Sequence, residues 1–108
     1  MFLVDVSAVE FIFERARTKF GGNGEPSLDK TGRPEWDVFL MSVTEFGLQR
    51  LRFRVAAAAG SFDGFAVGDR VEPVEVSLVP WEKNGFTNFS LRAKGLRPVA
   101  SAVRADAK

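Results

Sequence analysis

Apolar and polar side chains alternate along much of this chain, and the alternation predicts β-strands. In the segment LQRLRFRV, residues 48–55, three arginines (Arg50, Arg52 and Arg54) alternate with apolar side chains. Successive side chains of a strand point to opposite faces, so this strand is apolar on one face and carries three guanidinium groups on the other. Aligned like charges repel one another unless an anion lies across them, so the segment predicts an anionic partner.

The same alternation predicts four more strands, over residues 9–20, 35–43, 69–82 and 86–95. For the first of them a helix over residues 8–18 is the alternative, because several of its residues favour helices. We favour the strand. Pro73 and Pro80 have no amide N–H to donate, so we expect them at a sheet edge, a bulge or a strand end.

Gly- and Pro-rich stretches separate these strands. Residues 21–35 hold four glycines and two prolines and are expected to form a long loop. Residues 60–69 hold three glycines and are expected to pack Phe62, Phe65 and Val67 against the body. Tight turns are expected at Gly47 and over residues 83–85.

Five short strands without a compelling helix predict an all-β fold. The order of strands, loops and hairpins matches a small five-stranded OB-like barrel with a long loop between its first two strands. A chain of 108 residues is normally one domain. We therefore expect a single barrel over residues 1–98 and a flexible C-terminal tail over residues 99–108.

The chain contains no cysteine and no histidine, which narrows its function more than any motif does. Their absence excludes disulfides, thiolate nucleophiles, Ser-His-Asp chemistry and nearly every zinc or copper site. Carboxylate pairs such as Glu72 and Glu75 resemble scattered surface acids rather than a catalytic pair. We therefore expect a protein that is not an enzyme and that uses no metal or other cofactor.

The longest wholly apolar run, residues 55–59, is too short to cross a membrane, and the first twenty residues lack the regions of a signal peptide. We therefore expect a cytoplasmic protein with no membrane contact. The formal net charge is only +1, but the charge is unevenly distributed. The three arginines of residues 48–55 have no acid nearby in the sequence, and local fields of this kind decide what a surface attracts.

Nucleic-acid binding fits these charges best. In an OB barrel the ligand crosses strands 2 and 3 and is flanked by the loops that join strands 1 to 2 and 4 to 5. Cations of this region would contact phosphates, and its exposed rings would stack on unpaired bases. The candidate residues are Lys19, Phe20, Lys30, Arg33, Trp36, Arg50, Arg52, Arg54, Trp81, Lys83, Phe86 and Arg92.

A plainer interpretation stands beside this one. The three arginines can form ion pairs with acids of a neighbouring strand, such as Glu72 and Glu75, and Trp36 and Trp81 can be part of the core. The first functional hypothesis is a homo-oligomeric protein that binds single-stranded DNA with little sequence preference. The alternatives are a protein-interaction or regulatory module that uses the barrel surface, and duplex DNA binding by a β-ribbon of strands 2 and 3.

A series of short motifs lies between residues 28 and 98, at Thr31, Gly32, Pro34, Trp36, Gly68, Pro80, Trp81, Ser90, Arg92, Ala93, Gly95 and Arg97. In these motifs the chain resembles small proteins encoded on actinobacterial integrative and conjugative plasmids. These proteins are described as plasmid replication, integration and excision activators or as small regulatory proteins. The resemblance implies a role in plasmid or phage DNA replication or transfer, in which single-stranded DNA is exposed.

Overall fold

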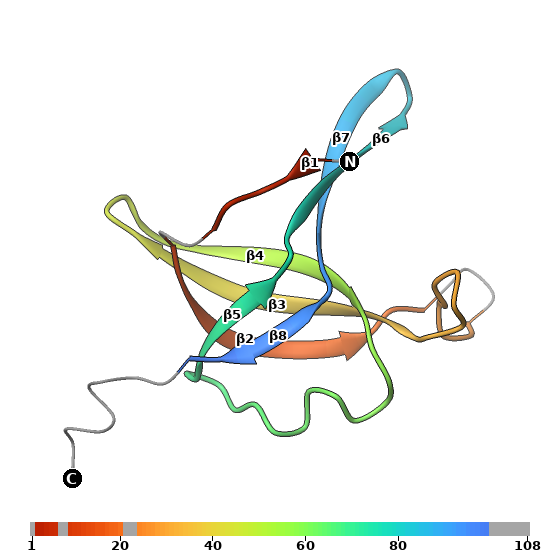
Figure 1. The fold of residues 1–108 in the computed structure, drawn as a ribbon. Coiled ribbons are helices and arrows are strands. Elements are labelled where there is room, and N and C mark those ends of the chain that lie inside the picture. The colour runs from red at the N-terminus through yellow and green to blue at the C-terminus, as the bar shows by residue number, and fades with distance from the viewer. Residues whose placement is uncertain (1, 7–8, 21–23, 100–108) are drawn as a thin grey trace, which may run out of the picture.

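The computed structural model describes residues 2–6, 9–20 and 24–99, and these residues form an all-β fold (Figure 1). The strand expected near the N-terminus is present as β2 (Glu10–Thr18), so the alternative helix over residues 8–18 does not form. Within the described ranges no helix is long and apolar enough to cross a membrane. The expected tail, apart from Val99, lies outside the described residues.

The described chain forms eight strands where the sequence predicted five. They make one sheet in the order β1-β6-β7-β4-β3-β2-β5-β8. The other strands are β1 (Phe2–Leu3), β3 (Glu35–Thr44), β4 (Gly47–Ala56), β5 (Arg70–Val74), β6 (Ser77–Lys83), β7 (Phe86–Ala93) and β8 (Gly95–Pro98).

The difference in strand number has a local cause. The strand expected over residues 69–82 is divided into β5 and β6 at Glu75, whose φ of 48° lies outside the extended region. The strand expected over residues 86–95 is divided into β7 and β8 at Lys94, whose N–H donates to the carbonyl oxygen of Val74 at 2.8 Å. The short β1 was not predicted.

Most of the hydrophobic core lies on the inward faces of the neighbouring strands β2, β3 and β4. Phe53 and Leu40 are among its largest fully buried side chains, and the rings of Phe11 and Phe53 meet edge to face with centroids 5.7 Å apart. The connector after β4 adds Phe62, which is buried. The expected packing of the connector is therefore confirmed for Phe62 and Phe65, but it is wrong for Val67, which is 80% exposed.

A β-bulge in β2 reverses the phase of its side chains. Phe13 pairs with Leu40 of β3, but the next paired residue is Arg15, which lies opposite Phe39, so Glu14 is extra. Without the bulge, Arg15 and Arg17 would follow Phe11 and Phe13 into the core. With it, both arginines are exposed on the outward face of the sheet.

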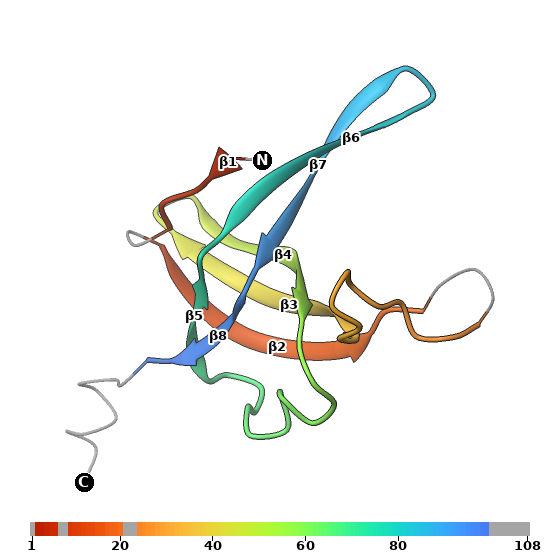
Figure 2. The same ribbon diagram turned by 45° about the vertical axis from the view of Figure 1, so that its right-hand side comes forward.

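The β6–β7 hairpin extends away from the rest of the sheet (Figures 1 and 2). Its two-residue turn is Asn84–Gly85, and both residues have positive φ, which suits the twist of a hairpin. β7 pairs in parallel with β4 over Leu91–Ala93 alone, and β1 pairs with only the first two residues of β6. Pro80 therefore lies near a free edge, as the sequence predicted.

Candidate nucleic-acid interface

Arginines dominate the outward face of β2, β3 and β4. The strand register forms two rows across it, Arg17–Asp37–Arg54 and Arg15–Phe39–Arg52, and Arg50 lies opposite Met41 in a third row. The opposite side of β4 contributes Phe53 and Val55 to the core, so the alternation predicted for residues 48–55 is confirmed. We call the outward set the arginine face: Arg15, Arg17, Asp37, Phe39, Met41, Arg50, Arg52 and Arg54.

Acids of β2 and β3, rather than of β5, lie beside these arginines. Arg50 Nη2 donates to Glu14 Oε2 at 2.7 Å. Asp37 lies between Arg17 and Arg54, with N···O distances of 3.7 and 3.9 Å. The suggested partners Glu72 and Glu75 instead pair with Arg97 and Lys94. The prediction that Glu72 and Glu75 pair with the three arginines is therefore wrong. The β2 bulge and the β3 register, which bring other acids to these arginines, leave no signal in the sequence.

The ion pairs leave the arginine face partly unneutralised. Five guanidinium groups share two carboxylates, those of Glu14 and Asp37, among the described residues. Arg52 makes no ion pair within the described part of the chain. The face therefore keeps positive charge that an external anion can meet.

An aromatic ring supports two of the guanidinium groups. The Cζ atoms of Arg15 and Arg17 lie 4.5 and 5.3 Å from the centroid of the Phe39 ring. These are cation–π distances, and the two arginines leave Phe39 only 9% exposed although it points outward. The stacking holds both guanidinium groups extended over the face before any ligand arrives.

Three hollows meet on this surface, and Arg54 lines all of them. The first, of ≈ 570 Å³, lies beside the ends of β2 and β4 and includes Lys19, Phe20 and Arg52. The second, of ≈ 220 Å³, lies between β4 and β7. The third, of ≈ 630 Å³, adds Arg33, Arg92 and Lys94. We call the surface of these three hollows the basic strip, because its cations outnumber its acids, which are Asp29, Asp37 and Glu75.

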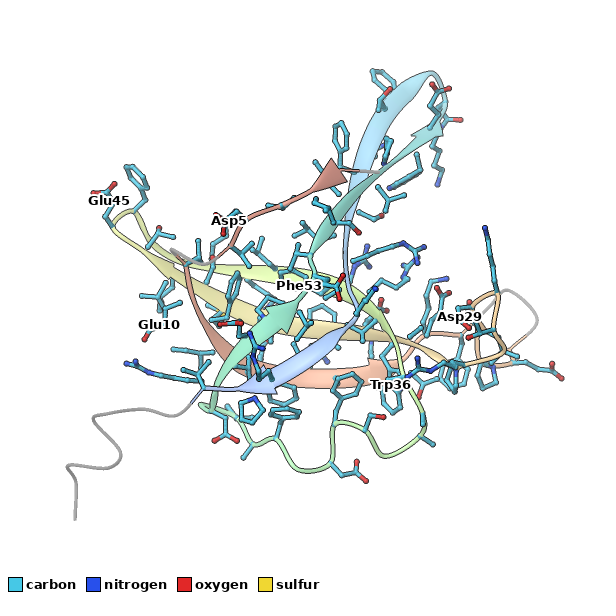
Figure 3. The ribbon with its side chains drawn as sticks, in the orientation of Figure 1. Asp5, Glu10, Asp29, Trp36, Glu45 and Phe53 are labelled. Carbon is cyan, nitrogen blue, oxygen red and sulfur yellow. The ribbon has the colours of Figure 1, made fainter. Side chains whose placement is uncertain are left out.

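The loop between β2 and β3 brings several candidate residues to one end of this strip. Phe20 is 60% exposed, and Lys30 and Arg33 are also exposed. Asp29, labelled in Figure 3, organises the loop: its Oδ1 accepts from the hydroxyl and N–H of Thr31 and from the N–H of Arg33. These bonds, with the Thr31 hydroxyl foremost, hold the pKa of the Asp29 carboxyl below its ordinary value.

Trp36 does not lie on the arginine face, so the structure does not bring this predicted stacking residue together with the arginines. The Trp36 indole N–H donates to the carbonyl oxygen of Ala57 at 2.9 Å, and its ring packs edge to face on Phe62 with centroids 5.2 Å apart. Figure 3 shows it beside the connector. The sequence left its side undecided because β3 is apolar on both faces.

Trp81, Lys83 and Phe86 lie on the projecting β6–β7 hairpin. Trp81 is 44% exposed and Phe86 is 72% exposed. Trp81 lies opposite Asn88, and two steps of two residues along β7 lead from Asn88 to Arg92, which is the partner of Arg54 in β4. By this alternation Trp81 and Arg92 belong to the same side of the sheet as the arginine face.

Arg92 connects the last strands to the start of β3. Its Nη1 donates to Glu35 Oε2 at 3.3 Å, and the other oxygen of this buried carboxylate accepts from the Ser27 hydroxyl at 2.8 Å. Arg92 is therefore half-buried and anchored. Through Glu35 and Ser27, Arg92 fixes the loop between β2 and β3 beside the basic strip.

Five members of the arginine face are absent from the residues that the sequence predicted. Strict alternation along residues 9–20 would put Arg15 and Arg17 on the side of Phe11 and Phe13, and no residue type in β2 signals the bulge that separates them. Asp37, Phe39 and Met41 lie in a segment that is apolar on both faces, so the pattern alone could not place them.

No protein-family model and no curated protein matches the sequence. Among solved structures, the fold is similar to the crystal structure of a small single-stranded DNA-binding protein from Streptomyces coelicolor. The two share 15% sequence identity over 89% of this chain and 92% of that chain, with a TM-score of 0.45. Similarity this low leaves the function of this chain to be judged from its own residues.

Proposed function

We propose that this protein is not an enzyme and that it binds single-stranded DNA across the arginine face, with little sequence preference. The observation that carries the proposal is the incomplete neutralisation of that face: five guanidinium groups on β2 and β4 share two carboxylates among the described residues. Guanidinium groups bind phosphates in a bidentate manner, and a strand of DNA supplies phosphates in a row.

The strand pairings support an OB-type barrel as the scaffold. β2 pairs antiparallel with both β3 and β5, and β4 pairs in parallel with β7. β7 continues into β8 after one residue, and β8 pairs with β5. These pairings, together with the chain connection from β7 to β8, give the path β2, β3, β4, β7, β8, β5 and back to β2. In such a barrel β3 and β4 carry the ligand, between the 19–34 loop and the β6–β7 hairpin.

The roles follow from exposure and from existing partners. Lys19, Arg52 and Lys83 would contact phosphates, with Lys30 and Arg33 at the loop end of the path. Arg54, which lines all three hollows, would contact the strand where they meet. Arg50 and Arg92 would contribute less, because Glu14 and Glu35 already hold them. The exposed rings that remain for stacking on bases are Phe20, Trp81 and Phe86.

The test is fluorescence anisotropy with a labelled oligo-dT at two salt concentrations. Because each neutralised phosphate releases counterions, we expect tight binding at low salt that weakens steeply as salt rises. A duplex of the same length serves as the control and should bind more weakly, since its bases offer no free face for stacking. Absence of oligo-dT binding at low salt would refute the proposal.

A second candidate function is a protein-interaction module that uses the barrel surface. The observation that favours it is the β3–β4 turn, where Phe46 is 91% exposed and Leu48 is 66% exposed. Exposed apolar groups of this kind mark protein contacts more often than phosphate contacts. Pull-down after nuclease treatment separates the two functions, because a protein partner survives the treatment and a DNA bridge does not.

The proposal has three further parts: the oligomeric state, the biological role and the cellular location. A homo-oligomer is proposed because one barrel covers few nucleotides. A role in plasmid or phage DNA replication or transfer rests on the sequence resemblance, and a cytoplasmic location follows from that role. Light scattering with and without oligo-dT tests the first of these, and plasmid maintenance in a deletion strain tests the second.

A further inference from the structure

Asp37 is a buried carboxylate in the middle of the arginine face, and it has no hydrogen bond at Oδ1. Its side chain is 7% exposed, and the nearest cationic nitrogens, Arg17 Nε and Arg54 Nη2, are 3.7 and 3.9 Å from its oxygens. Both distances exceed hydrogen-bond length. Arg54 Nε is likewise buried without a partner. The row therefore has one acceptor and one donor unused.

The neighbours of Asp37 in the protein leave part of its acceptor capacity unused. A buried acceptor without a hydrogen bond costs the desolvation of that group, and the cost is larger for a charged one. An apolar residue would fill this position on β3 at lower cost. An unused acceptor between two arginines therefore points to a ligand that completes the set.

The hollow beside Asp37 has the contents of a nucleotide site. It measures ≈ 570 Å³, within the range of about 300–1,000 Å³ that holds small ligands. Lys19 and Arg52 on its wall can take the phosphates that flank one base, and the exposed ring of Phe20 can stack on that base. A phosphate would avoid the Asp37 carboxylate, so the group that reaches it must donate hydrogen.

The row Arg17–Asp37–Arg54 presents donor, acceptor and donor in that order. The Watson–Crick edge that complements it is acceptor, donor and acceptor, which is the edge of thymine: O4, N3–H and O2. Cytosine has no N–H at its central position, and neither does adenine. Guanine has the central N–H but places an amino group against the second arginine.

We propose that this hollow is a thymine-selective subsite in which Asp37 accepts the N3–H of one base while Arg17 and Arg54 donate to its two carbonyl oxygens. The inference rests on the proposed binding of single-stranded DNA and adds one base-reading position to it. Arg17 is accessible to a base that enters the hollow, because its side chain is 57% exposed. Uracil shares the same edge and is accepted equally.

The test uses short oligo-dC strands that carry one central base, with binding measured by anisotropy at low salt. Because an oligo-dC strand can bind in several registers, a strand with one dT can shift until that base occupies the hollow. The matched control is N3-methylthymine, which keeps the ring and its stacking but has no N3–H. A strand with dU in place of dT checks that the thymine methyl group is not what is read.

We expect the native protein to bind the dT and dU strands about tenfold or more tightly than the N3-methylthymine and all-dC strands, the effect of one charge-assisted hydrogen bond. The Asp37→Leu variant should bind all four alike. Equal binding of dT and N3-methylthymine by the native protein would overturn the inference, and this result needs no variant that folds. Undiminished discrimination by Asp37→Leu would also overturn it. If no strand binds, the proposed function itself fails.

Discussion

Arg52 offers the sharpest perturbation of the proposed phosphate path. It is the arginine of β4 that forms no ion pair among the described residues, so replacing it leaves no acid unpaired. The proposed path offers four cations for phosphates that are not assigned to a base: Lys19, Arg33, Arg52 and Lys83. If each neutralises one phosphate of a single strand, log K falls with log salt at a slope of about −3, because each phosphate contributes about −0.7.

The Arg52→Gln variant should lower this slope to about −2. A fourfold rise in salt would then weaken binding about 20-fold in the variant and about 50-fold in the native protein. Arg70→Gln is the matched control, because Arg70 is also an exposed strand arginine but pairs with Glu10 away from the arginine face. Its slope should equal the native one.

The assay is an anisotropy titration of oligo-dT at several salt concentrations, with far-UV circular dichroism to confirm that each variant is folded. A native slope near zero would show that phosphates do not hold the strand. An unchanged slope in Arg52→Gln, or an equal drop in Arg70→Gln, would show that the strand does not follow the arginine face. Any one of these three results would refute the proposal that the arginine face binds the phosphates.

Three other predictions test separate parts of the structure. Trp81→Ala should weaken oligo-dT binding by about 1–3 kcal/mol, the loss of one stacked base, without changing the unfolding midpoint in urea. Phe53→Ala should lower the free energy of unfolding by about 3–5 kcal/mol, measured in urea, because its ring is fully buried. The pKa of Asp29 is lowered in the folded loop, so the loop contacts should persist above the ordinary carboxyl pKa and be lost as pH falls through the lowered one. An NMR titration of the Thr31 and Arg33 amides checks this, and Asp29→Asn, which keeps an acceptor, should remove the pH dependence.

The sequence was sufficient to predict the β4 alternation because period two depends only on neighbouring residues. Phe53 and Val55 are buried and alternate with Arg52 and Arg54 on the outward face, as their order in the sequence predicts. The partners of those arginines could not be predicted, because they depend on register. Asp37 reaches Arg54 only because residues 37 and 54 lie opposite each other in the β3–β4 pair.

The bulge at Glu14 and the side of Trp36 were not predictable for related reasons. A bulge changes which face the following residues occupy but leaves the composition of the strand unchanged, so strict alternation from Phe11 and Phe13 puts Arg15 and Arg17 on the wrong face. β3 is apolar on both faces, and its inward side was settled by packing against the connector, where Phe62 receives Trp36. Long-range packing of this kind leaves no local pattern.

The two carboxylates of the arginine face explain how it can stay ordered and still attract an anion. With none, five guanidinium groups would repel one another and lose their extended positions. With five, no charge would remain for a phosphate. Glu14 fixes Arg50 by a hydrogen bond, whereas Asp37 holds Arg17 and Arg54 at distances that leave their donors available. These side chains are thus largely ordered before the proposed ligand binds, which lowers the entropy cost of binding. The same geometry predicts that Glu14→Gln, which removes the charge that neutralises Arg50, should steepen the salt dependence, whereas Asp37→Leu should remove the preference for thymine.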